Sequence, residues 1–192
     1  MFSDPLAFFN SLYKQYQDTE VSESSAMTLA TATTDARPSA RVVLLKAFDE
    51  SGFAFYTNLG SRKALELAKN PFAALCFYWE PIGYQIRIEG TVVKVSDTEA
   101  DIYFDSRPRD SQIGAWASRQ SETLSSRATL DARVNALNEK YAGRDVPRPD
   151  FWSGYKVVPE RYEFWQRRLN RLHERICYVK NNIGWQRKLL YP

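Results

Sequence analysis

The feature that most constrains the fold is a series of short apolar runs joined by tight turns. Residues 72–79 (FAALCFYW) and 85–95 (QIRIEGTVVKV) are two such runs, joined by a turn at 80–83 (EPIG). A connection this short suits an antiparallel pair, because a parallel crossover needs a dozen or more residues. The second run alternates apolar and charged residues, as a half-buried strand does. Gly90 interrupts it and predicts either a β-bulge or the close approach of a bound group.

Similar runs recur along the chain and predict most of the remaining elements. We expect further strands at 26–34, 40–48, 53–57, 154–159, 161–166, 175–180 and 185–191. Residues 40–48 (ARVVLLKAF) are almost continuously apolar, which predicts a strand buried on both faces and paired with 53–57 in a hairpin. Helices are expected from Asp4, over 61–69, from the capping box at Ser96 and over 129–141. Without repeated βαβ units, this pattern predicts a mainly β (α+β) fold, an antiparallel barrel with peripheral helices.

The composition is that of a soluble globular protein, and residues 1–192 suit a single domain. The net charge of +3 is too small to indicate a nucleic-acid partner. Cys76 and Cys177 are far apart and lack metal-ligand spacing, so we expect two reduced thiols, no metal and a cytoplasmic location. No apolar run approaches the ~20 residues needed to cross a membrane, and the N-terminal MFSDPLAFF lacks a basic n-region. We therefore expect neither a membrane span nor a signal peptide.

A first candidate anion site is the start of the helix expected at 61–69. Ser61 is placed to cap it, and Arg62 and Lys63 occupy its first turn. The free backbone N–H groups and the positive dipole end of a helix N-terminus attract anions. Two cations there break the usual preference for acidic residues, and such departures concentrate at functional sites. The alternative is an ordinary exposed helix start that tolerates both cations.

A second candidate anion site lies in residues 103–121 (YFDSRPRDSQIGAWASRQS). Tyr103, Arg107 and Ser111 are spaced four apart, so on a helix they share one face. Pro108 divides the stretch into two short helices that meet near Arg107. A guanidinium and two hydroxyls that converge in this way suit a phosphate. The alternative is a solvated, arginine-rich connector.

Several stretches together resemble the pyridoxamine 5′-phosphate oxidase family, flavin-dependent enzymes that make pyridoxal 5′-phosphate. The matching stretches are RVVLLK (41–46), FYTNLGSRKALEL (55–67), FYWEP (77–81), SRPRDSQIGAWASRQS (106–121), FW (151–152), EFWQ (163–166) and RLHER (171–175). They occur in the family's order and spacing, from Asp4 to Pro192. The resemblance implies an FMN-binding split β-barrel that works as a homodimer. FMN would lie at the subunit interface, and residues 150–192 would complete the dimer and the active site.

The resemblance also implies roles for particular residues. Arg41, Arg62 and Lys63 would hold the FMN phosphate, with Ser61 nearby. Further flavin contacts, some of them from the second subunit, would come from Val42, Val43, Leu44, Leu45, Lys46, Tyr56, Thr57, Gln85, Gln120, Ser121, Trp165 and Arg175. The substrate phosphate would be bound by Lys46, Tyr103, Arg107 and Ser111. Arg171 and His173 would face the substrate's pyridine ring as catalytic and substrate-binding residues.

The implied reaction is the FMN-dependent oxidation of pyridoxamine 5′-phosphate or pyridoxine 5′-phosphate to pyridoxal 5′-phosphate. Dioxygen accepts the electrons and yields hydrogen peroxide, and the amine substrate also releases ammonia. A cofactor phosphate and a substrate phosphate need two anion sites, and the sequence offers two. Two alternatives stay open: a related FMN-dependent oxidase acting on another ring, such as a phenazine precursor, and a non-catalytic protein that binds FMN or pyridoxal phosphate.

Four features depart from the family pattern. The chain starts almost at the first helix, so we expect the family's N-terminal arm over the substrate to be short or absent. Tyr84 stands where an arginine is common, Arg167-Arg168 replaces a frequently glycine-containing turn, and Glu174 replaces the usual aspartate. None of these changes removes a residue assigned to FMN or to the substrate phosphate.

Overall fold

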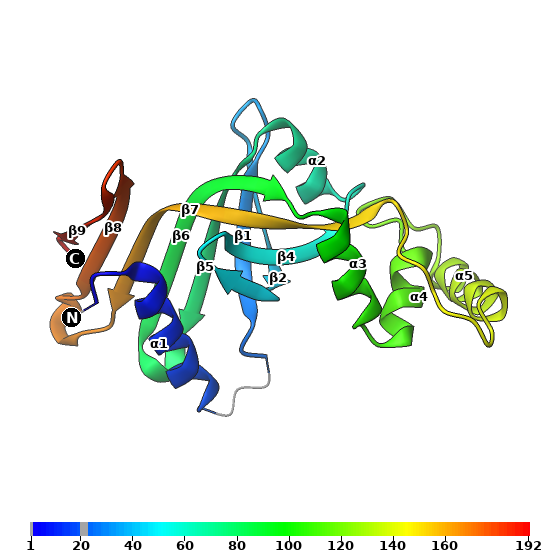
Figure 1. The fold of residues 1–192 in the computed structure, drawn as a ribbon, viewed down its shortest axis with the longest axis horizontal. Helices are drawn as coiled ribbons and strands as arrows, with labels where there is room; N and C mark the ends of the chain where they lie inside the picture. The colour runs from blue at the N-terminus through cyan, green and yellow to red at the C-terminus, as the bar shows by residue number, and fades with distance from the viewer. Residues whose placement is uncertain (1, 20–22) are drawn as a thin grey trace.

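The computed structural model describes residues 2–19 and 23–192, and over these ranges it contains one antiparallel sheet of nine strands together with five α-helices. The strands are β1 (Ala26–Ala32), β2 (Pro38–Leu44), β3 (Ala47–Asp49), β4 (Gly52–Asn58), β5 (Phe72–Trp79), β6 (Tyr84–Lys94), β7 (Trp152–Gln166), β8 (Glu174–Asn181) and β9 (Gly184–Leu190). Their order is β2-β1-β5-β6-β7-β4-β3, with β8 paired to β7 and β9 to β8. The sheet curls into an open barrel (Figure 1), which confirms the expected antiparallel split β-barrel.

The two longest strands, β6 and β7, pair along almost their whole length. The register between them shifts at Gly90, which marks a β-bulge. A Cβ there would lie 1.9 Å from the carbonyl oxygen of Val158, so the close neighbour of Gly90 is the backbone of β7. The expectation of two strands, at 154–159 and 161–166, was wrong, because the bulge accommodates Glu160 and β7 continues through both ranges.

The apolar run at 40–48 also differs from its prediction. It divides into β2, which pairs with β1, and the three-residue β3, which forms the short hairpin with β4. Because β2 is an edge strand, its side chains alternate between exposed and half-buried positions, and Val42 is 67% exposed. The expected burial on both faces was therefore wrong, and the exposed positions of β2 are free to line a cavity.

The main hydrophobic core lies between the sheet and α1 (Pro5–Gln17). The carboxylate of Asp4 caps α1 by accepting hydrogen bonds from the first free N–H groups, as predicted. Phe9 is fully buried, and its ring centroid lies 4.9 Å from that of Phe53 and 5.1 Å from that of Phe77. Burying one such aromatic side chain contributes about 1.5–3 kcal/mol, so the contact with α1 stabilises the sheet.

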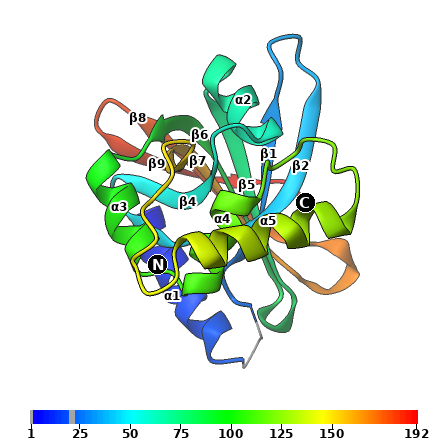
Figure 2. The same ribbon diagram turned by 90° about the vertical axis from the view of Figure 1, so that its right-hand side faces the viewer.

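Four further helices follow the sheet. They are α2 (Arg62–Lys69), α3 (Asp97–Asp105), α4 (Arg109–Ala117) and α5 (Arg127–Lys140). Helices α3, α4 and α5 gather at one end of the sheet, where α4 and α5 lie side by side (Figures 1 and 2). The β8–β9 hairpin lies at the opposite end (Figure 1). Both cysteines are free thiols, and within the described ranges no helix is long and apolar enough to span a bilayer.

Candidate active site

A cavity of about 1010 Å³ opens between β2, the end of β4, the start of α2 and the α3–α4 junction. Both candidate anion sites open into it. The predicted site residues that line it are Arg41, Val42, Val43, Leu44, Lys46, Tyr56, Thr57, Arg62, Lys63, Tyr103, Arg107, Ser111, Gln120 and Ser121. Two other predicted cofactor residues adjoin this wall: Leu45 is buried in the hydrophobic core, and Ser61 is buried beside Lys63.

Lys63 is the most deeply placed cation of the cavity. Its ammonium donates hydrogen bonds to Thr57 Oγ1 and Gln120 Oε1, each over 3.1 Å, and to Ser61 Oγ over 3.4 Å. Burial lowers the pKa of Lys63, and the nearby charge of Arg41 lowers it further. All three acceptors are neutral oxygens, so over the described ranges the buried charge has no carboxylate partner. A bound anion would supply one.

The start of α2 is built differently from its prediction. Ser61 is the N-cap residue, but its side chain makes no capping hydrogen bond, because the hydroxyl turns toward Thr57 and Lys63. The backbone N–H of Arg62 instead donates a hydrogen bond to Ser121 Oγ over 3.2 Å. The loop that follows α4 thus closes over the helix N-terminus. Hydroxyls and free N–H groups at such a terminus form an anion-binding surface.

The second anion site has the predicted two-helix arrangement. Helix α3 ends at Asp105, Ser106 is its C-cap, and α4 begins after Pro108. The guanidinium of Arg107 lies between them, 4.9 Å from the ring centre of Trp152. Its Nη1 atom is buried and has no hydrogen-bond partner in the described part of the chain. Burial lowers the pKa of Arg107. An arginine remains charged regardless, so this unpartnered donor is available to an anion.

An aromatic wall connects the two anion sites. The ring of Tyr56 stacks on that of Tyr103 with 3.9 Å between centroids, and on that of Trp152 with 5.4 Å. Tyr56 lies near the end of β4, which leads to the residues around Lys63, and Tyr103 lies on α3, which leads to Arg107. The stack of the two rings therefore sets the distance between the two anion sites. Trp152 was not among the predicted site residues, because its contact with Arg107 arises only from the packing of β7 against α3.

The remaining predicted residues lie elsewhere. Gln85, Trp165 and Arg175 are direct neighbours across β6, β7 and β8. The carboxylate of Glu163, which is 3% exposed, forms an ion pair with Arg175, in which Oε1 lies 2.9 Å from Nε and 2.8 Å from Nη2. Arg171 is exposed in the loop between β7 and β8.

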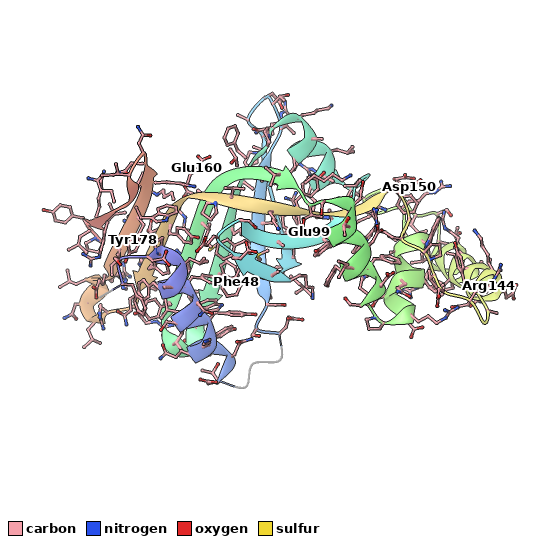
Figure 3. The ribbon with its side chains drawn as sticks, in the orientation of Figure 1. Phe48, Glu99, Arg144, Asp150, Glu160 and Tyr178 are labelled. Atoms are coloured by element: carbon pink, nitrogen blue, oxygen red, sulfur yellow. The ribbon has the colours of Figure 1, made fainter. Side chains whose placement is uncertain are left out.

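This second group lies far from the cavity. Tyr56 pairs with Gly154 on β7, whereas Gln85 and Arg175 flank Trp165, eleven positions further along the same strand. Strands rise about 3.3 Å per residue, so the two groups are separated by on the order of 30 Å. In Figure 3, Asp150 just before β7 and Tyr178 on β8 mark these opposite ends of the molecule. One copy of the chain therefore does not bring all the predicted site residues together.

The imidazole of His173 is held in one orientation by its neighbours. The backbone N–H of Arg168 donates a hydrogen bond to its Nδ1 over 3.2 Å, and the ring lies 4.4 Å from that of Trp165. Since a backbone N–H can only donate, Nδ1 must be the acceptor nitrogen. In this geometry Nε2 carries the ring N–H and is the hydrogen-bond donor.

Backbone strain occurs at two candidate residues, Ser121 and Arg171, and at Asn170 beside Arg171. Asn170 and Arg171 have φ values of 55° and 62°, and Ser121 has 76°. A non-glycine residue in the left-handed region costs about 1–3 kcal/mol and is concentrated at ligand-binding and catalytic segments. Sequence reasoning could have noted only Asn170, because asparagine tolerates this region better than most residues.

The open antiparallel barrel places the chain in the class of split-barrel proteins, and its cavity suits anionic ligands. The family model described as "Pyridoxamine 5'-phosphate oxidase" matches residues 13–141, and the model described as "Pyridoxine 5'-phosphate oxidase C-terminal dimerisation region" matches residues 152–192. The chain therefore belongs to the pyridoxamine 5′-phosphate oxidase family, a family of oxidoreductases, which confirms the resemblance seen in the sequence.

Individual relatives agree with this assignment. The chain is 55% identical over 192 residues to a pyridoxine/pyridoxamine 5′-phosphate oxidase of Sphingopyxis alaskensis, which covers 100% of this chain and 89% of that protein. It is 33% identical to PhzG of Burkholderia lata, solved with tetrahydrophenazine-1-carboxylic acid, with a TM-score of 0.94 over 100% of this chain and 94% of that one. An FMN-binding protein of Nostoc punctiforme shares the fold, with a TM-score of 0.78 and 15% identity over 98% of both chains.

Proposed function

We propose that this protein oxidises pyridoxamine 5′-phosphate and pyridoxine 5′-phosphate to pyridoxal 5′-phosphate, with FMN as cofactor and dioxygen as electron acceptor. The observation that carries the proposal is the presence of two separate cationic sites in one cavity, joined by the Tyr56–Tyr103 stack. One site would take the cofactor phosphate and the other the substrate phosphate. Identity of 55% over the whole chain to a relative named pyridoxine/pyridoxamine 5′-phosphate oxidase supports this substrate class.

The residues around Lys63 fit the phosphate end of FMN. Lys63 has a buried charge with only neutral partners, and Arg41 and Arg62 line the same wall. Together with the start of α2 they would bind the phosphate by charge-assisted hydrogen bonds. Tyr56, Thr57 and the exposed face of β2 would then lie along the rest of the cofactor. Bound FMN would supply the redox chemistry, a two-electron oxidation at C4′ of the substrate coupled to the reduction of dioxygen to hydrogen peroxide.

The residues around Arg107 would bind and orient the substrate. Arg107 offers an unpartnered Nη1 donor in the described part of the chain. The cavity beside it is lined by Tyr103, Ser111 and Lys46. Gripping the phosphate uses binding energy remote from the reacting carbon to hold C4′ in place, which lowers the entropic cost of the reaction. An unphosphorylated vitamer would lack this anchor, so it would be a poor substrate.

A second copy of the chain would supply the residues at the far end of the sheet. Residues 152–192 match a dimerisation region, and they contain Trp165, Arg171, His173 and Arg175. Because one copy separates these residues from its own cavity by on the order of 30 Å, each cavity of a homodimer would be completed by the partner. There His173 Nε2–H would donate to the substrate, and Arg171 would lie against its ring.

The test is a turnover assay on FMN-reconstituted protein with pyridoxine 5′-phosphate. Pyridoxal 5′-phosphate and hydrogen peroxide would be followed together, with unphosphorylated pyridoxine as the matched control. We expect both products, in equal amounts, from the phosphorylated substrate alone. A flavin-loaded protein that makes neither product would contradict the proposal.

A second candidate function is the oxidation of a phenazine precursor. The observation that favours it is the structural likeness to PhzG, whose TM-score of 0.94 covers the whole chain. Assaying the parent protein with pyridoxine 5′-phosphate and with tetrahydrophenazine-1-carboxylic acid separates the two candidates, because each predicts turnover of a different one of these substrates.

A further inference from the structure

We infer that Glu66, on the buried face of α2, positions Arg41 and Arg62 and thereby sets how strongly the cavity prefers a phosphorylated flavin to an unphosphorylated one. The inference rests on the proposed function, because it concerns the site proposed for the FMN phosphate. Glu66 would not touch the cofactor. It would act through the two guanidinium groups that do.

The carboxylate of Glu66 connects three elements of the fold. Its Oε1 accepts a hydrogen bond from Arg62 Nε on α2 over 2.9 Å. Its Oε2 accepts hydrogen bonds from Ser39 Oγ on β2 over 2.6 Å and from Thr31 Oγ1 on β1. The same oxygen lies 3.4 Å from Nη2 of Arg41. The same two hydroxyls accept from the Arg41 guanidinium, each over 2.6 Å. The position of Arg41 is thus set jointly by Glu66 and by the hydroxyls that Glu66 orients.

Glu66 is ionised in this setting. It is 6% exposed, and burial alone would raise its pKa, but hydrogen bonds from Ser39, Thr31 and Arg62 outweigh burial and lower the pKa to about 2. The wall therefore carries three cations, Arg41, Arg62 and Lys63, and one anion. A phosphate dianion would bring the sum of these charges to zero. Without Glu66, the three cations would repel one another and the two arginines would lose their common anchor.

A purely structural role would look different. The pair Arg62–Glu66 has the i,i+4 spacing of an ordinary helix ion pair, and such pairs on exposed helices contribute little to stability. On α5 the pair Arg127–Asp131 has the same spacing and the same 2.9 Å distance, with both side chains more than half exposed. Glu66 differs because Oε2 is directed at β1 and β2, toward a second cation that lines the cavity.

The experiment compares the affinities of FMN and riboflavin in the full-length protein, measured by quenching of flavin fluorescence. The variant is Glu66→Gln, which keeps the size of the side chain and removes its charge. The matched control is Asp131→Asn, which removes the acidic partner of the i,i+4 pair on α5. Because charge-assisted hydrogen bonds are lost, we expect Glu66→Gln to weaken FMN binding by about tenfold to a hundredfold. Riboflavin affinity should stay unchanged, since riboflavin has no phosphate, and Asp131→Asn should alter neither.

The outcomes separate this inference from the proposed function. If the parent protein binds neither flavin, the proposed function fails. If the parent prefers FMN and Glu66→Gln keeps that preference undiminished, the inference alone is wrong. Equal weakening of both flavins would assign Glu66 a structural role and also overturn it. Should Glu66→Gln not fold, Ser39→Ala removes one donor to Oε2 without a change of charge, and a preference for FMN that Ser39→Ala leaves intact would count against the inference.

Discussion

The backbone N–H of Arg168 and Nδ1 of His173 are joined by a hydrogen bond of 3.2 Å, which leaves Nε2–H as the only donor the imidazole can offer. We predict that His173→Gln, whose side-chain amide can still donate, keeps more activity than the donor-free His173→Leu. The loss in His173→Leu should be about tenfold to a hundredfold in kcat/KM, the value of one hydrogen bond to a reacting group. Steady-state kinetics with pyridoxine 5′-phosphate measure it. Equal losses in the two variants would argue against a donor role.

Arg107 should govern substrate affinity without affecting flavin binding. We predict that Arg107→Ala raises the KM for pyridoxine 5′-phosphate by about tenfold to a hundredfold, because a charge-assisted contact to the phosphate is lost. The flavin absorbance of the purified protein should not change. Arg109→Ala is the matched control, since Arg109 lies two positions away and its guanidinium is bonded to the carbonyl oxygens of Tyr141 and Arg144. Flavin loss in Arg107→Ala would move Arg107 to the cofactor site.

The parts of the site that could be predicted from the sequence are those that depend on local spacing. Tyr103 on α3, Ser111 on α4 and Arg107 at the junction between the two helices line one cavity, and the cations at 62–63 open α2. Glu66 and Trp152 could not be found in this way. Each acts through a contact made across the fold: Glu66 reaches 35 residues back along the chain to Thr31, and the ring of Trp152 lies beside the guanidinium of Arg107.

The errors in the predicted sheet have the same origin. Residues 40–48 are as apolar as a strand buried on both faces, but β2 is an edge strand beside a cavity. Val42, Val43 and Leu44 of β2 line that cavity, and Val43 also packs against the core, so apolar character here does not require burial on both faces. The break expected near Glu160 was placed by composition, whereas the bulge opposite Gly90 lets β7 continue. Edge position and bulges are set by pairing partners, which periodicity alone does not reveal.

Lys63 should control cofactor retention. We predict that Lys63→Met, which keeps the length of the side chain and removes the charge, raises the Kd for FMN by about tenfold to a hundredfold. Lys69→Met is the control, because Lys69 is exposed at the far end of the same helix. Equilibrium dialysis against FMN measures both variants. An unchanged Kd in Lys63→Met would show that the buried ammonium serves only to connect Thr57 and Gln120.

The acid stability of the protein should depend on Glu66. Its pKa is about 2 in the folded chain against an ordinary value of 4.5, so the folded state binds a proton less readily than the unfolded state. The stabilisation is therefore fully present above about pH 4.5 and is lost as the pH falls toward 2. We predict that the difference in melting temperature between the parent and Glu66→Gln is largest at neutral pH and shrinks between pH 5 and pH 2. A difference that stays constant over this range would exclude Glu66 as the titrating group.

The separation between the cavity and the group around Trp165 predicts that two variants, each nearly inactive at an FMN concentration close to the parent's Kd, can restore each other's activity. Lys63→Met damages the cavity end of the chain, and Arg171→Ala damages the far end. If each active site takes its cavity from one copy and Arg171 from the other, a mixed dimer has one site with both changes and one with neither. Statistical mixing of the two variants should then recover about a quarter of the parent activity after co-refolding. A site contained within one copy would recover none, because every cavity would keep one of the two changes. Mixing each variant with itself gives the baseline, and sedimentation of the mixed sample confirms that dimers formed.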